Sequence, residues 1–131
     1  MYKTILCAIE STRESESVLS KASELAKLCN GKLLVIHVLP YKFLPKDYQK
    51  ELEEDTLPKI ERIADKFGVH KGNRIIKVGK PYELICSIAE KKKADLIVIG
   101  THSRTGIKSL LGSTANNVVN YAECDVSLVK V

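Results

Sequence analysis

The stretch Gly100–Thr114 has the residue types and the position of an anion-binding loop. It reads GTHSRTGIKSLLGST and lies between the apolar run Leu96–Ile99 and the helix-like run Ala115–Ala122. Such a loop connects the end of a buried strand to the N-terminus of a helix, where unpaired N–H groups and the helix dipole favour an anion. Its three glycines permit tight turns and let a ligand approach the backbone closely. The stretch therefore predicts a phosphate site.

Two well-known phosphate motifs do not fit this stretch. A P-loop has four residues between its first glycine and the Gly-Lys-Ser/Thr end. Here five residues separate Gly100 from Gly106, and Ile107 separates Gly106 from Lys108. The dinucleotide fingerprint GxGxxG should follow the first strand, but the sequence there is IESTRE. Both kinds of loop are excluded.

The sequence also carries no familiar metal or hydrolase pattern. Its three histidines are scattered, none has a Cys, Asp or Glu at ligand spacing, and there is no GxSxG elbow. No constellation provides a general base beside a positioned water, or ligands that would hold Mg²⁺ without phosphate. We therefore expect binding, with slow hydrolysis at most.

The rest of the chain alternates between strand-like and helix-like segments. Apolar runs predict strands at Thr4–Ile9, Leu33–Leu39, Arg74–Val78, Asp95–Ile99 and Val126–Val131. Helical spacing of apolar residues follows each of the first four runs. This alternation predicts an α/β fold, with a parallel sheet covered by helices on both faces. In such sheets a ligand lies beyond the C-terminal ends of the strands, where the strand order reverses.

Local signals place several boundaries within this pattern. Ser11–Glu14 is a capping-box sequence, which predicts the start of the first helix. Pro58 predicts a kink in the second helix, or two helices that meet near Leu57. Pro81 suits the first turn of the third helix. The alternating polar residues of Arg74–Val78 predict an edge or near-edge strand.

Length and composition predict a single domain over residues 1–131. The net charge of +5 is modest and aromatic residues are few, so we expect no nucleic-acid partner. The four cysteines lack metal-site spacing and are expected to act as small buried hydrophobes. The N-terminus enters a strand pattern at once and no apolar run reaches membrane-spanning length, so we expect a cytoplasmic protein without a membrane partner.

Segments along nearly all of the chain resemble the universal stress protein family, in the family's order. They are ILCAIEST, ELAKLCNGKLLVIHVL, GKPYELI, GTHSRTG…LLGST and VSLVKV. The loop segment is similar to the family's nucleotide signature of Gly, two residues, Gly, nine residues and Gly-Ser/Thr. The resemblance implies a Rossmann-like, adenine nucleotide alpha hydrolase-like domain with five parallel strands in the order 3-2-1-4-5. It also implies a homodimer formed through the last strand, residues 126–131.

The resemblance further implies where a nucleotide would bind. Glu10 takes the place of an aspartate near adenine and ribose, Val38 contacts adenine, and Gly100 begins the phosphate loop. The implied contact residues are Ile9, Glu10, Val38, Gly100, Ser103, Gly112, Ser113 and Thr114. The chain departs from the family pattern in three ways. Glu10 is longer than aspartate, Ser103 stands where the signature has glycine, and eight residues rather than nine separate Ser103 from Gly112.

The function implied by the resemblance is that of a small regulatory protein of the stress response that binds ATP, AMP or ADP. Mg²⁺ would be held through the phosphates, and an unknown protein partner would recognise the nucleotide-bound form. The alternative is a nucleotide-free dimeric interaction module whose site is vestigial. Arg104 and Lys108 either reach phosphate or remain solvated, and His37 is expected to be a hydrogen-bonded core histidine.

Overall fold

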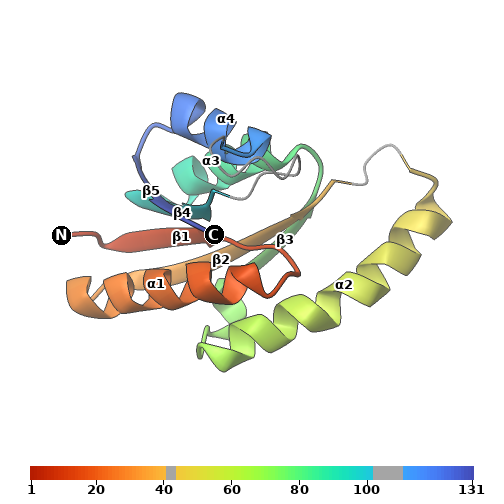
Figure 1. The fold of residues 1–131 in the computed structure, drawn as a ribbon, viewed down its shortest axis with the longest axis horizontal. Helices are drawn as coiled ribbons and strands as arrows, with labels where there is room; N and C mark the ends of the chain where they lie inside the picture. Colours follow the sequence, from red (N-terminus) through yellow and green to blue (C-terminus); the bar gives the residue numbers. More distant parts are fainter. Residues whose placement is uncertain (41–43, 102–110) are drawn as a thin grey trace.

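Five parallel strands form one sheet in the order β3-β2-β1-β4-β5. The computed structural model describes residues 1–40, 44–101 and 111–131. Its strands are β1 (Thr4–Ala8), β2 (Lys32–Leu39), β3 (Arg74–Val78), β4 (Leu96–Gly100) and β5 (Asp125–Val129). The predicted α/β fold and the strand order 3-2-1-4-5 are confirmed. β1 lies in the middle of the sheet, between β2 and β4 (Figure 1).

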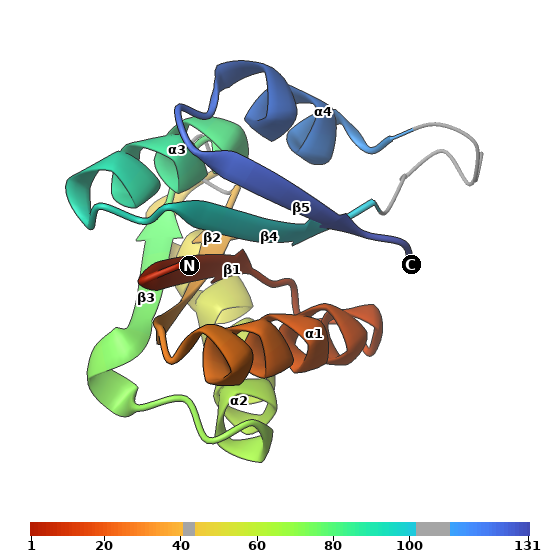
Figure 2. The ribbon, with the colours of Figure 1, turned by 90° about the vertical axis from the view of Figure 1, so that its left-hand side faces the viewer.

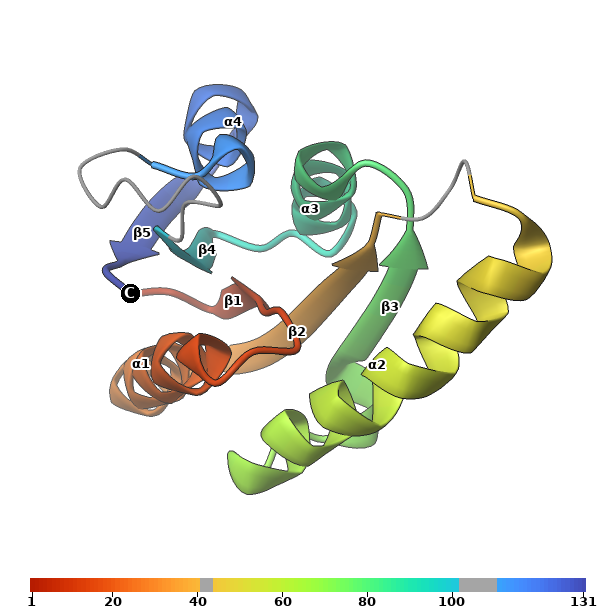
Figure 3. The ribbon, with the colours of Figure 1, turned by 45° about the vertical axis from the view of Figure 1, so that its right-hand side comes forward.

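Helices cover both faces of the sheet. They are α1 (Glu14–Cys29), α2 (Lys46–Lys66), α3 (Pro81–Lys91) and α4 (Ser113–Tyr121), with a short 3₁₀ turn η1 (Lys71–Asn73) before β3. Figures 1 and 3 show α1 and α2 on one side of the sheet and α3 and α4 on the other. In Figure 2 the two layers of helices lie above and below the strands.

Two hydrophobic clusters hold these layers together. Alternate residues of β1 point to opposite faces, so Ile5 and Cys7 join the cluster under α1 and α2, whereas Leu6 joins the cluster under α3 and α4. Both clusters are closed by helix residues such as Leu19 and Ile85. A sheet covered on both faces needs apolar residues at successive positions, which explains the unbroken apolar runs of the central strands.

The two ends of the sheet differ from its centre. β3 and β5 each have one strand neighbour, and both contain exposed or half-buried positions. The prediction that Arg74–Val78 is an edge strand is therefore confirmed. In contrast, β4 is buried from Leu96 to Ile99.

Two local predictions require correction. The first helix begins at Glu14, within the predicted Ser11–Glu14 segment, but not with the predicted capping box, because its N-cap is Arg13 in a helical conformation, without a side-chain cap hydrogen bond. The two-helix alternative for the second helix is wrong, since α2 continues through Pro58. Pro58 is exposed, so water can satisfy the carbonyl that loses its intrahelical donor there. The predicted place of Pro81 in the first turn of α3 is confirmed.

The cysteines are free thiols in different surroundings. Cys7 is fully buried in the sheet, where desolvation raises the pKa of its thiol, as expected of a small core residue. Cys29, Cys86 and Cys124 are only partly buried. Across the described parts of the chain, no helix is both long enough and apolar enough to span a membrane.

Candidate functional site

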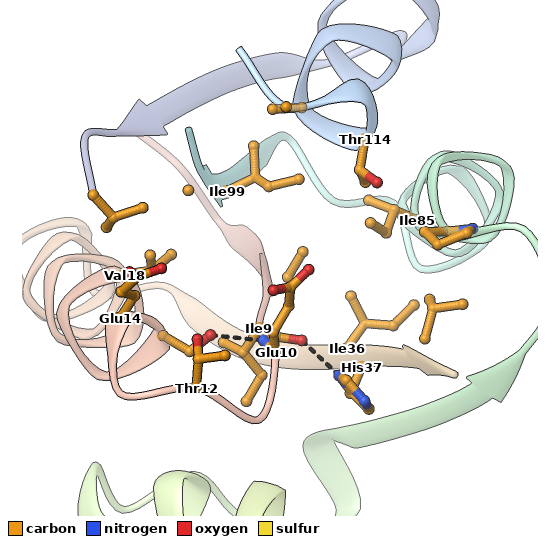
Figure 4. Close-up of a pocket in the computed structure, with 18 of the residues that line it drawn as sticks. Ile9, Glu10, Thr12, Glu14, Val18, Ile36, His37, Ile85, Ile99 and Thr114 are labelled. Carbon is orange, nitrogen blue, oxygen red and sulfur yellow. Dashed lines mark hydrogen bonds between the residues drawn. The ribbon is translucent and has the colours of Figure 1, made fainter. Parts of the chain in front are cut away.

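A cavity of about 760 Å³ opens at the C-terminal end of the sheet. Residues after β1, at the end of β2 and at the end of β4 line it, together with the start of α1 and the start of α4 (Figure 4). β1 pairs with β2 on one side and β4 on the other, so the cavity lies where the strand order reverses. This is the usual ligand position in an open parallel sheet.

The structure brings most of the predicted site residues to this one cavity. The lining residues include Ile9, Glu10, Val38, Gly100, Gly112, Ser113 and Thr114. They come from four segments that are far apart in the sequence. Ser103 lies outside the described residues, as do His102, Arg104 and Lys108. Contact of Ser103 with a nucleotide remains a prediction, and for Arg104 and Lys108 the alternatives of phosphate contact and solvation both remain.

One part of the cavity wall is apolar. Ile9 and Val38 are 3% and 8% exposed, and Ile99 is 6% exposed. Ile85 of α3 completes this wall. Apolar side chains around a concave site favour a planar ring that buries both of its faces.

Glu10 contributes a carboxylate to the lining of the cavity. It follows β1 directly, and Figure 4 shows its side chain pointing toward the centre of the cavity. An ionised carboxylate only accepts hydrogen bonds, so it suits ligand groups that donate them, such as sugar hydroxyls or amines.

Ser15 holds the turn that presents Glu10, and the sequence analysis missed it. The Glu10 backbone amide donates to the Ser15 hydroxyl oxygen at 2.7 Å, and Ser15 is 5% exposed. The sequence signal was the serine-rich start of α1, but the capping-box pattern directed attention to Ser11 and Glu14. The tertiary structure instead uses a serine inside the first turn of α1.

His37 joins the ends of the two central strands. Its Nδ1 lies 2.7 Å from the carbonyl oxygen of Ile9. Because a carbonyl only accepts, Nδ1 carries the proton and Nε2 is the acceptor of the neutral ring. Burial lowers the pKa of His37, while the hydrogen bond to Ile9 acts in the opposite direction. The prediction of a hydrogen-bonded core histidine is confirmed, and His37 also lines the cavity.

The N-terminus of α4 faces the cavity, and its first amides have no acceptor within the helix. Gly112 is the N-cap, with φ −60° and ψ 155°, and its carbonyl accepts from the Asn116 amide at 3.0 Å. The amides of Ser113, Thr114 and Ala115 precede that first bond and have no acceptor within the helix. They also lie at the positive end of the helix dipole, so they favour an oxyanion.

Gly100 is placed where a side chain would crowd the cavity edge. A β-carbon on it would lie 3.1 Å from Cγ2 of Val18 and 3.2 Å from Cγ2 of Val131. The next residue, Thr101, donates its amide to Val129 at 2.9 Å and accepts from the Val131 amide at 3.2 Å. The end of β4 is therefore held against the C-terminal segment.

The charge of the described lining is negative. Glu10 and Glu14 are its only charged side chains, with no Lys or Arg among the described lining residues. Within the described lining, positive potential therefore comes from the α4 amides. Among residues 1–40, 44–101 and 111–131, no group of three His, Cys, Asp or Glu residues could hold a metal ion.

Comparisons with known proteins agree with this geometry. The model of the universal stress protein family matches residues 1–130. Universal stress protein A homolog 2 of Coxiella burnetii is 33% identical over 140 residues, which cover 99% of this chain and 96% of that protein.

Two similar solved structures contain adenine nucleotides. A universal stress protein in complex with cAMP is 25% identical with a TM-score of 0.72, and the match covers 98% of this chain and 97% of that chain. The universal stress protein from Archaeoglobus fulgidus in complex with dAMP is 28% identical with a TM-score of 0.70, over 98% of both chains.

Proposed function

Because the chain belongs to the universal stress protein family, we propose that it is a small regulatory protein of the stress response that binds ATP, AMP or ADP. One observation carries the proposal. Seven residues implied as nucleotide contacts by the family resemblance line a single cavity at the C-terminal end of the sheet. Its volume of about 760 Å³ is within the usual range of small-molecule sites.

Each part of the cavity has a chemical role in this proposal. Adenine packs against Ile9 and Val38, and the Glu10 carboxylate accepts from the ribose hydroxyls. The phosphates lie against the amides of the α4 N-terminus, with Ser103 and the residues from Gly112 to Thr114 around them. Gly100 lets the phosphates approach the backbone closely. Mg²⁺ is held through the phosphates, which supplies the positive charge that the described lining lacks.

The solved relatives support the adenosine part of the ligand. The two complexes share an adenine base and a phosphate, although cAMP and dAMP differ in their sugars. Our proposal adds the second and third phosphates of ATP and a Mg²⁺ ion to what these complexes contain. The proposed role is binding, with slow hydrolysis at most.

We also propose that the protein is a cytoplasmic homodimer formed through residues 126–131. β5 is an edge strand, and an unpaired edge needs a partner or a cover. Leu128 is 39% exposed on that strand, so pairing with a second copy buries apolar surface as well as backbone groups. Sedimentation at high concentration tests this. A monomer there contradicts the dimer.

The test of nucleotide binding is direct. Protein purified without added nucleotide is denatured, and the released small molecules are identified by mass spectrometry. Calorimetry with ATP and Mg²⁺ follows, with AMP and ADP as competitors. Heat of binding supports the proposal. The absence of both heat and a thermal shift at millimolar nucleotide contradicts it, and leaves a nucleotide-free interaction module of the same fold.

A further inference from the structure

A second concave site lies between α3 and α4, apart from the cavity described above. We call it the α3–α4 groove. It has a volume of about 570 Å³ and is lined by Tyr82, Glu83, Cys86, Ser87, Ala89, Glu90, Lys93, Ala94, Ile97, Tyr121, Ala122, Glu123 and Cys124. None of these residues lines the larger cavity. Figures 1 and 2 show the two helices side by side on one face of the sheet.

Two stacked tyrosines form one wall of the groove. The ring centroids of Tyr82 and Tyr121 are 5.4 Å apart, with 28° between the ring planes. Tyr121 remains 63% exposed although it is stacked. The chain has only seven Phe and Tyr residues in total, so two at one groove are a notable share of its aromatic surface. Exposed aromatic rings of this kind favour recognition of a partner group.

One of the two tyrosine rings already contacts a cation of the same chain. The Lys80 ammonium lies 5.0 Å from the centroid of the Tyr82 ring and 3.8 Å from a Glu83 carboxylate oxygen. A cation is therefore stabilised here by a ring face and a carboxylate together. No cation of the described part of the chain stacks on the outer Tyr121 ring, and Glu90 and Glu123 line the same groove.

The charges of the groove oppose the charge of the whole protein. Its lining has three carboxylates, Glu83, Glu90 and Glu123, and one ammonium, Lys93. The chain as a whole carries a net charge of +5. A negative, aromatic-walled groove on a positive protein is complementary to a basic ligand and discourages an acidic one.

The floor of the groove is uncharged. Cys86 and Cys124 are partly buried, and Ala94 and Ile97 lie between the helices and the sheet. Desolvation raises the pKa of both thiols, so they stay protonated at neutral pH. Such a floor suits the aliphatic stem of a long side chain whose charged end meets the carboxylates.

We propose that the α3–α4 groove docks an arginine-bearing segment of a partner protein, with a guanidinium against Tyr121 and hydrogen bonds to Glu90 and Glu123. Arginine fits better than lysine, because its planar group stacks on a ring and pairs with a carboxylate through two N–H groups at once. The proposal gives a chemistry to the unknown partner of the proposed function, but it does not depend on nucleotide in the larger cavity.

The test uses the intact chain and a capped hexa-arginine peptide. Amide shifts are followed by NMR as peptide is added, and we expect the largest shifts along α3, α4 and residues 121–124. Tyr121→Ala, and separately the double change Glu90→Gln with Glu123→Gln, should each weaken binding by about threefold or more. Capped hexa-lysine of equal charge should bind more weakly than hexa-arginine.

Matched controls separate this groove from general attraction. Tyr48→Ala removes another exposed tyrosine, which is 55% exposed on α2, and Glu24→Gln removes an exposed carboxylate of α1. Neither should change the affinity. In a second measurement, hexa-arginine should slow maleimide labelling of Cys86 and Cys124 but not of Cys29, which is also partly buried but lies on α1.

Three results would overturn the proposal. Shifts spread evenly over all acidic surface, or equal losses in the controls, show nonspecific charge attraction. No shift at millimolar peptide shows that the groove does not bind arginine. Shifts at the groove that depend on protein concentration without peptide show that a second copy of the chain occupies it.

Discussion

The hydroxyl oxygen of Ser15 accepts a hydrogen bond from the backbone amide of Glu10 at 2.7 Å. This bond closes the turn between β1 and α1, and the buried serine leaves no room for water to replace it easily. The conformation of this turn directs the Glu10 carboxylate into the cavity (Figure 4). Ser15 therefore positions the carboxylate that we propose as a nucleotide contact.

Replacing Ser15 should affect both stability and binding. Ser15→Ala leaves the Glu10 amide without this acceptor, which should lower the free energy of unfolding by about 1–3 kcal/mol. Affinity for ATP should fall as well, because the turn that orients Glu10 loosens. Urea unfolding and calorimetry measure the two effects. The control is Ser17→Ala, an exposed serine of the same helix, which should change stability by less than about 0.5 kcal/mol.

Gly112 tests the phosphate part of the site. Its φ of −60° and ψ of 155° are open to any residue, so a substitution does not strain the backbone. Gly112→Val should reduce ATP affinity at least tenfold, about 1.4 kcal/mol, because the added side chain stands at the N-terminus of α4. Calorimetry measures the affinity and circular dichroism checks the fold. Unchanged affinity in a folded variant would show that the phosphates bind elsewhere.

Gly100 tests the packing at the cavity edge. The methyl group of Gly100→Ala would lie 3.1 Å from Val18 Cγ2, which is tighter than ordinary contact. We expect a loss of about 1–3 kcal/mol from overpacking, which exceeds the gain of about 0.4–1 kcal/mol from a less flexible unfolded chain. Urea unfolding of Gly100→Ala measures this loss.

Val18→Ala should partly relieve the overpacking in the Gly100→Ala variant, and urea unfolding of both single variants and the double variant measures the coupling between the two positions. Removing the crowded methyl groups makes the double variant more stable than the sum of the two single losses, by about 0.5 kcal/mol or more. Simple additivity would show that the clash is absorbed at Val131 instead of Val18.

His37 should make stability depend on pH. Its pKa in the folded state lies below the ordinary value of 6.5, so the unfolded chain binds the proton more readily. The stabilisation is therefore complete above about pH 6.5 and is lost as the pH falls below that value toward the folded pKa. The advantage of the native chain over His37→Gln in urea unfolding should shrink from pH 7.5 to pH 5.5. A constant difference over that range would contradict the lowered pKa.

Several features of the fold could be predicted from the sequence because they depend on local periodicity. Unbroken apolar runs such as Thr4–Ile9 indicate strands covered on both faces, and the alternating polar residues of Arg74–Val78 indicate an edge. The glycine pattern from Gly100 to Gly112 indicates a loop between a strand and a helix. These signals are carried by residues that are close along the chain.

Other features were decided only by contacts between distant residues. The hydrogen bond from His37 to Ile9 and the packing of Gly100 against Val131 depend on how strands and helices are placed beside one another. The stacking of Tyr82 on Tyr121 similarly requires α3 and α4 to lie side by side. The sequence alone determined which segments are strands and helices, because each segment's pattern reflects the faces that it buries. The tertiary structure determined the site, because a cavity is formed by side chains that only the completed sheet brings within contact distance.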